Sequence, residues 1–115
     1  MRVAIFSDKE GDLEKNLADA LGEKGHEAEL FLDEAAIFEA EPRIDVVLVN
    51  FNETNVSAGT VSIQMCMRKQ KPVYVVHGVE AENVPRDFSR LRLEFGHYSD
   101  YDRLFAYLKA IEEEK

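Results

Sequence analysis

The residues in this sequence that could do chemistry are short polar side chains that follow apolar runs. Ser57, Gly59 and Thr60 open a predicted helix, where free backbone N–H groups can bind an anion. Gly59 would let a phosphate approach the backbone closely, and the two hydroxyl groups could donate hydrogen bonds to a phosphate or a sugar. The alternative is an ordinary helix start, because Ser and Thr are common there.

Two further groups of polar residues follow other apolar runs. Ser7 and Asp8 come directly after the run at residues 2–6. Asp8 could contact a ribose hydroxyl, a base edge or a metal, although such a polar segment is also typical of a turn. Asn50 and Asn52 lie in the loop after another run. Asparagine is common in turns at strand ends, so a ligand role and a turn role both stay open for this pair.

His77 follows the apolar run at residues 73–76 and is the last candidate. A lone histidine more often makes a structural hydrogen bond than acts in catalysis, and both roles stay open. No pair of His or Cys residues has the spacing of a metal site, so we expect no metal. Neither the glycine-rich dinucleotide pattern nor the P-loop lysine pattern is present, and we expect no tightly bound cofactor.

Strands and helices that alternate along the chain must position these candidates. Continuous apolar runs at 2–6, 45–50 and 73–76 are typical of strands buried on both faces. The Lys24-Gly25 pair and Pro42 are typical helix ends. The remaining predicted elements are strands at 27–32 and 90–95, and helices at 13–24, 34–40, 58–69 and 101–111.

This alternation predicts an α/β, doubly wound (flavodoxin-like) three-layer sandwich. We expect a five-stranded, mostly parallel sheet in the order 2-1-3-4-5. In such sheets a ligand binds beyond the carboxyl ends of the strands, at the switch between strands one and three. The predicted site is therefore the mouth at this switch, lined by the candidates above.

Bulk properties exclude several classes of function. The 115 residues predict a single α/β domain, 1–115. The net charge of -9 argues against nucleic acids and anionic membranes as partners. Cys66 is the only cysteine and cannot form an internal disulfide, which favours a cytoplasmic location. We find no signal-peptide core and no apolar stretch near the roughly 20 residues that a membrane span needs.

Three segments resemble the nucleoside 2-deoxyribosyltransferase-like family. They are the runs Asp45–Asn50, Val56–Val61 and Lys71–Val75. Family members carry an aspartate-initiated strand, a Ser-x-Gly-Thr loop, a helix and a Lys-Pro-Val strand. The match covers about residues 45–76 and implies the same doubly wound sheet.

The resemblance implies glycosyl-transfer chemistry but also a departure from it. The family's nucleophile is a glutamate three residues past the threonine, where it attacks the anomeric carbon of a 2-deoxynucleoside. Here that position is Ile63, and the next residue, Gln64, is neutral. Glu53 in the adjacent loop is a possible substitute. It therefore stays open whether the chain is an enzyme. If it is one, the expected activity is that of a deoxyribosyltransferase or a nucleotide N-glycosidase, and no catalytic residue is assigned.

From the resemblance we predict a protein that binds a nucleoside, a nucleotide or a related sugar phosphate, with weak or no transferase activity. Ser57, Gly59 and Thr60 would hold the phosphate or 5′-hydroxyl end, while Asp8 and Asn50 would contact the sugar or base. The expected partner is a small-molecule nucleoside or nucleotide. A homodimer is expected as well, because small proteins with a crevice often complete their sites across a dimer.

The chain also resembles the response-regulator receiver family, which has the same sheet order and nearly this length. In that comparison Asp8 is an acidic magnesium residue after strand one, and Asn50 takes the place of the phospho-accepting aspartate. The lysine that receivers carry after strand five has no clear equivalent in residues 95–98. The alternative function is therefore a pseudo-receiver that acts as a protein-interaction module.

Overall fold

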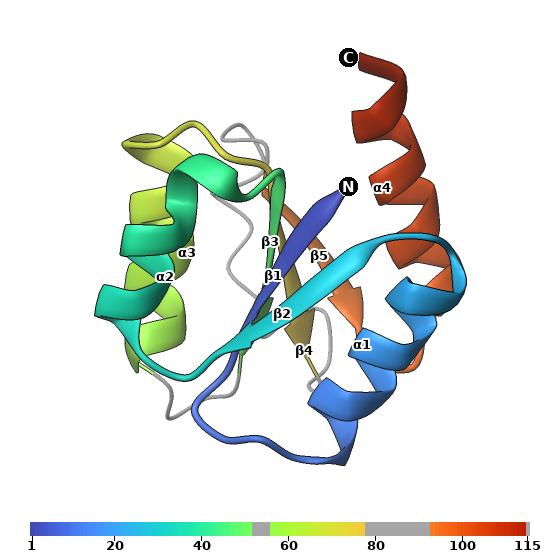
Figure 1. Ribbon diagram of the computed structural model, residues 1–115, viewed down its shortest axis with the longest axis horizontal. Helices are drawn as coiled ribbons and strands as arrows, with labels where there is room; N and C mark the ends of the chain where they lie inside the picture. Colours follow the sequence, from blue (N-terminus) through green and yellow to red (C-terminus); the bar gives the residue numbers. More distant parts are fainter. Residues whose placement is uncertain (52–55, 78–92, 115) are drawn as a thin grey trace.

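The computed structural model describes residues 1–51, 56–77 and 93–114, and Figure 1 shows their arrangement. Asn52, Glu53 and residues 90–92 of the predicted fifth strand lie outside these ranges. The elements, in chain order, are β1 (Arg2–Phe6), α1 (Asp12–Glu23), β2 (Glu27–Phe31), α2 (Glu34–Ala40), the 3₁₀ turn η1 (Glu41–Arg43), β3 (Val46–Asn50), α3 (Val56–Met67), β4 (Val73–His77), β5 (Leu93–His97) and α4 (Tyr101–Glu114).

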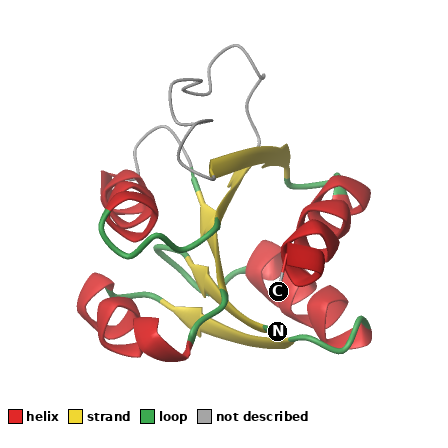
Figure 2. Cartoon of the chain, turned by 90° about the horizontal axis from the view of Figure 1, so that it is seen from above, coloured by secondary structure: helices red, strands yellow, loops and turns green. Residues whose placement is uncertain are grey.

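The strands form one sheet in the order β2-β1-β3-β4-β5, and every neighbouring pair is parallel. Figure 2 shows helices on both faces of this sheet. The predicted fold class and strand order are thus confirmed. The cause is the one expected from the sequence, because β3 and β4 are apolar up to their last residues, Asn50 and His77, and are buried on both faces.

Two apolar clusters fill the layers between the sheet and the helices. On one face Ile37 of α2 and Met65 of α3 pack against β1, β3 and β4. On the other face Leu17 of α1 and Leu108 of α4 pack against the opposite side chains of the same strands. Alternate residues of each strand therefore enter different clusters, as the pleat of a strand requires.

Local sequence signals explain most helix boundaries, with small differences from the prediction. Gly25 has a φ of 85° and follows the end of α1, as expected for a residue that tolerates a left-handed conformation. Gly11, and not Asp12, is the N-cap of α1. Helix α2 ends at Ala40 because Pro42 lies in the 3₁₀ turn after it. Helix α3 begins at Val56, two residues before the predicted start.

Within the described ranges, none of the helices combines the length and the apolar character that crossing a membrane requires.

Candidate functional site

A hydrogen-bonded group of three side chains lies at the carboxyl ends of β1 and β3. We call it the Glu14 cluster, and it consists of Ser7, Glu14 and Asn50. The Ser7 hydroxyl donates to Glu14 Oε1 at 2.5 Å, and Asn50 Nδ2 donates to the same oxygen at 2.8 Å. Asn50 Nδ2 also lies 3.3 Å from Ser7 Oγ. The cluster thus joins the switch between β1 and β3 to the first turn of α1.

Backbone groups complete the cluster. The Gly11 N–H donates to Glu14 Oε2 at 3.1 Å, and the Lys9 N–H donates to Ser7 Oγ at 3.4 Å. Both oxygens of the Glu14 carboxylate therefore accept hydrogen bonds from the protein. Glu14 is 2% exposed and Ser7 is fully buried, so the group is largely shielded from water. A buried carboxylate is stable only when it is paired or hydrogen-bonded in this way.

The charge state of Glu14 follows from these contacts. Burial alone would raise the pKa of Glu14. Hydrogen bonds from Ser7, from its own backbone, from Asn50 and from Gly11 outweigh that effect, so the pKa is lowered below the ordinary glutamate value. Glu14 is therefore a buried anion at neutral pH. It places a fixed negative charge where this fold ordinarily accepts a ligand.

The side chains of the cluster are engaged with one another. The Asn50 side chain is a neutral amide whose nitrogen donates to Glu14, and the Ser7 hydroxyl donates to the same carboxylate. The arrangement is suited to holding β1, β3 and α1 together.

Two other predicted site residues lie at the same edge of the sheet. Asp8 follows Ser7 and is exposed. His77 ends β4 and is 7% exposed; its ring centroid lies 6.1 Å from that of His97, which ends the neighbouring strand β5. Asn52 lies outside the described residues. The structure thus brings Ser7 and Asn50 together, whereas His77 is grouped with a histidine that the sequence analysis did not single out.

The small residues of α3 do not share one hollow. Gly59 lines an apolar cavity of about 130 Å³ against β4 and β5, together with Phe95. Thr60 lines a groove between α2 and α3, together with Phe38. Ser57 lies in the first turn of α3 and is half-buried. Their ligand-binding role stays a prediction. Because Gly59 and Thr60 line different hollows, a single phosphate could not contact both hollows at once.

Glu14 is the residue that sequence reasoning missed. A weak signal existed, since a glutamate three residues after an N-cap commonly reaches back to the N-cap N–H. Glu14 has this relation to Gly11. That signal predicts a helix cap and says nothing of Asn50, which is 36 residues away in the chain. Within the described ranges, no group of three or more His, Cys, Asp or Glu side chains could hold a metal ion.

Several solved structures similar to this fold are response-regulator receivers. TrrA from Thermotoga maritima, in complex with Mg²⁺-BeF, is 17% identical and has a TM-score of 0.77 over 96% of this chain and 97% of that chain. The BeF3-activated receiver domain of RstA from Klebsiella pneumoniae is 14% identical, with a TM-score of 0.76 over 96% and 97%. A CheY-like receiver domain from Methylobacillus flagellatus is 17% identical, with a TM-score of 0.76 over 96% and 98%. No protein-family model and no curated protein sequence matches the chain.

These similarities correct the predicted family. The assignment to the nucleoside 2-deoxyribosyltransferase-like group is wrong, because receivers share nearly the whole fold. The quoted match at residues 45–76 covers β3, α3 and β4. A strand, a helix and a parallel strand recur in every doubly wound sheet. The sequence match therefore reflects this common unit of the fold and not membership of one family.

The predicted function and the predicted ligand depended on this family assignment and are corrected with it. Nucleoside or nucleotide binding and a small-molecule nucleoside partner were wrong predictions, whereas the expected homodimer stays a prediction. The physical reason lies in the Glu14 cluster. The predicted mouth holds a buried carboxylate already bound to Ser7 and Asn50, which would repel a phosphate.

Proposed function

We propose that this chain is a receiver-like protein-interaction module that phosphorylation at the end of β3 does not control. The observation that carries the proposal is Asn50, which ends β3 and donates to the buried carboxylate of Glu14 at 2.8 Å. The similarity of the fold to receivers such as TrrA and RstA supports the scaffold part of the proposal.

The chemistry of the amide supports the second part. A receiver accepts a phosphoryl group on a carboxylate oxygen at the position that Asn50 takes here. The Asn50 nitrogen already donates hydrogen to Glu14, and its lone pair is delocalised into the amide carbonyl, so it is a poor nucleophile toward phosphorus. An incoming phosphoryl group would also meet the negative charge of Glu14.

Metal binding is opposed by the same arrangement. The structure of TrrA is described as a complex with Mg²⁺-BeF. Magnesium prefers several oxygen ligands in octahedral geometry, usually one or two carboxylates with waters. In this chain Asp8 is exposed, while both carboxylate oxygens of Glu14 already accept hydrogen bonds. Tight magnesium binding is therefore not expected.

The setting of such a module is part of the proposal. We place it in the cytoplasm, because its only cysteine, Cys66, is buried and cannot form an internal disulfide, which suits a reducing compartment. We also treat residues 1–115 as one domain, since the match to TrrA extends over 96% of the chain.

Phosphorylation in vitro tests the proposal. The chain and TrrA are incubated in parallel with magnesium and acetyl phosphate, then with magnesium and beryllofluoride. Intact-mass spectrometry should detect a phosphoryl adduct on TrrA only. Amide chemical shifts of this chain should stay unchanged with beryllofluoride. A stoichiometric adduct on the wild-type chain that disappears in Asp8→Asn or Glu14→Gln would contradict the proposal.

A further inference from the structure

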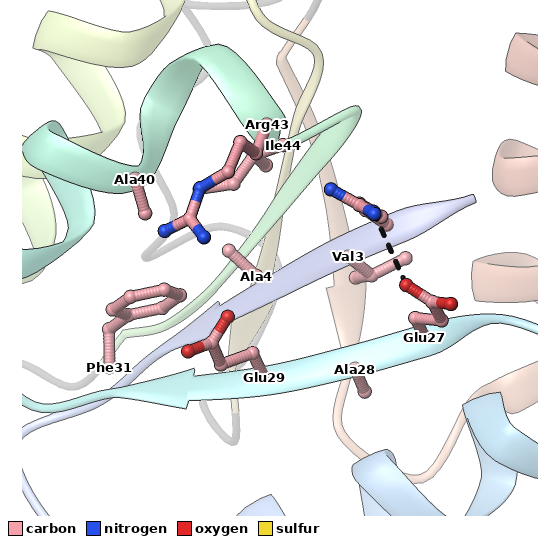
Figure 3. A pocket seen from close by; sticks show the side chains of 10 residues that line it. Val3, Ala4, Glu27, Ala28, Glu29, Phe31, Ala40, Arg43 and Ile44 are labelled. Atoms are coloured by element: carbon pink, nitrogen blue, oxygen red, sulfur yellow. Dashed lines mark ion pairs between the residues drawn. The ribbon is translucent and has the colours of Figure 1, made fainter.

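A hollow of about 380 Å³ lies over β1 and β2 on the face that carries α2 (Figure 3). It exists because α2 ends at Ala40 and the chain turns through η1 back to the sheet. The helix therefore leaves the first residues of β1 and β2 without a cover. The hollow shares no residue with the Glu14 cluster.

Four charged side chains line this hollow, two of each sign. Arg2 and Glu27 neutralise each other through an ion pair of 3.3 Å. Arg43 and Glu29 behave differently. Figure 3 shows the Arg43 guanidinium and the Glu29 carboxylate pointing into the hollow from opposite walls. Neither forms an ion pair with any residue in the described ranges.

The floor between these two charges is apolar. Ala4 of β1, Phe31 of β2 and Ile44 after η1 line it, and each is less than a tenth exposed. Hollows of roughly 300–1,000 Å³ with an apolar lining and a few polar groups are typical of small-molecule sites. This hollow has that size, and its lining combines an apolar floor with charged side chains.

The distribution of charge selects the class of ligand. The hollow is locally neutral although the chain carries a net charge of -9. An anion bound to Arg43 would face Glu29, and a cation bound to Glu29 would face Arg43. A ligand with one charge of each sign satisfies both groups, since a guanidinium binds a carboxylate through two parallel hydrogen bonds and a carboxylate accepts from an ammonium.

We propose that this hollow binds a free amino acid with an apolar side chain. Arg43 holds the α-carboxylate, Glu29 accepts hydrogen bonds from the α-ammonium, and the side chain lies on the floor formed by Ala4 and Phe31. The proposal is independent of the proposed function, because phosphorylation and amino-acid binding are assigned to different residues.

Calorimetry with matched ligands tests this site on the full chain. L-leucine is compared with 4-methylpentanoate, which lacks the ammonium, and with 3-methylbutylamine, which lacks the carboxylate. We expect leucine to bind and each analogue to bind about tenfold more weakly or worse, because each loses a charged hydrogen bond. Arg43→Gln and Glu29→Gln should each weaken leucine binding by a similar factor.

Two substitutions of equal charge change serve as controls. Arg68→Gln, directly after α3, and Glu23→Gln at the end of α1 alter exposed residues away from the hollow and should leave leucine binding unchanged. Melting temperatures of all four variants verify that they fold. No heat of binding at millimolar leucine overturns the proposal. So does binding that Arg43→Gln and Glu29→Gln leave unaltered, or an analogue that binds as tightly as leucine.

Discussion

Glu14 and Glu29 show two opposite ways in which this fold treats a carboxylate. Glu14 is 2% exposed, and both of its oxygens accept hydrogen bonds from the protein. Glu29 is exposed on the edge strand β2 and faces Arg43 across an open hollow without forming an ion pair with it. The first carboxylate is fully satisfied by the chain, whereas the second still has its hydrogen-bonding capacity available to a ligand.

The comparison distinguishes polar groups that hold the fold together from charged groups that are accessible to a ligand. In doubly wound sheets the mouth at the strand switch is where a ligand is ordinarily expected. Here the Glu14 cluster lies at that switch with its hydrogen bonds made inside the protein, whereas Arg43 and Glu29 lie over β1 and β2. The proposed site therefore rests on charged groups that form no ion pair within the described ranges, and not on position in the fold.

The largest effect is expected from placing a second carboxylate in the Glu14 cluster. Asn50→Asp removes a donor and puts an anion within hydrogen-bond distance of Glu14, which should cost about 3 kcal/mol of stability at pH 7. The shared site raises a carboxyl pKa in the folded variant, so the folded state binds more protons than the unfolded one. Its stability should therefore fall as the pH rises from about 4 to 7.

Urea unfolding of wild type and Asn50→Asp across this pH range measures the effect. Asn50→Ser serves as a control, because it shortens the side chain without adding charge and should show no comparable dependence on pH. A variant that is as stable as wild type at pH 7 would show that the cluster does not require an amide at residue 50.

A smaller effect is expected from replacing the carboxylate itself. Glu14→Gln turns one acceptor oxygen into a donor that faces another donor, the Gly11 N–H or the Asn50 amide, and should cost about 2 kcal/mol. The matched change Glu29→Gln should alter stability by about 0.5 kcal/mol or less, because Glu29 is exposed. Equal losses in the two variants would abolish the distinction between the closed and the open carboxylate.

The same pair of variants gives a test by pH. The folded-state pKa of Glu14 is lowered, so its charge stabilises the fold above the ordinary glutamate range. That stability is lost as the pH falls through the folded pKa. Glu14→Gln should therefore flatten the acid limb of the stability profile, while Glu29→Gln should leave it unchanged.

The smallest effect concerns a buried polar atom that has no partner. The Tyr74 hydroxyl is buried without a hydrogen-bond partner in the described ranges, and a Cβ at residue 96 would overlap it, which explains why Gly96 lies beside it. Burial raises the pKa of Tyr74 to about 12, so the phenol is neutral at physiological pH. Tyr74→Phe should raise the free energy of unfolding by about 1 kcal/mol.

Tyr107→Phe is the matched control for this gain. The Tyr107 hydroxyl donates to the Val73 carbonyl oxygen at 3.4 Å, so its removal should be neutral or slightly destabilising. Thermal unfolding of both variants in the same buffer measures the difference. A loss of stability in Tyr74→Phe would mean that the Tyr74 hydroxyl is satisfied after all.

Much of the scaffold could be predicted from local patterns. The apolar runs of β1, β3 and β4 predicted strands buried on both faces, and Pro42 and Gly25 predicted helix ends. These signals act over a few residues, where side-chain size and backbone freedom decide the outcome. The function could not be predicted in the same way, because the motif at residues 45–76 is compatible with strand-helix-strand units of many different functions.

The sequence by itself determined the parallel sheet, its strand order and the presence of an amide at the end of β3. Only the tertiary structure decided that Glu14 lies beside Asn50 and that Arg43 faces Glu29 across a hollow. The reason is physical: strand and helix formation depend on neighbours in the chain, whereas hydrogen bonding and charge compensation depend on groups that only packing brings together.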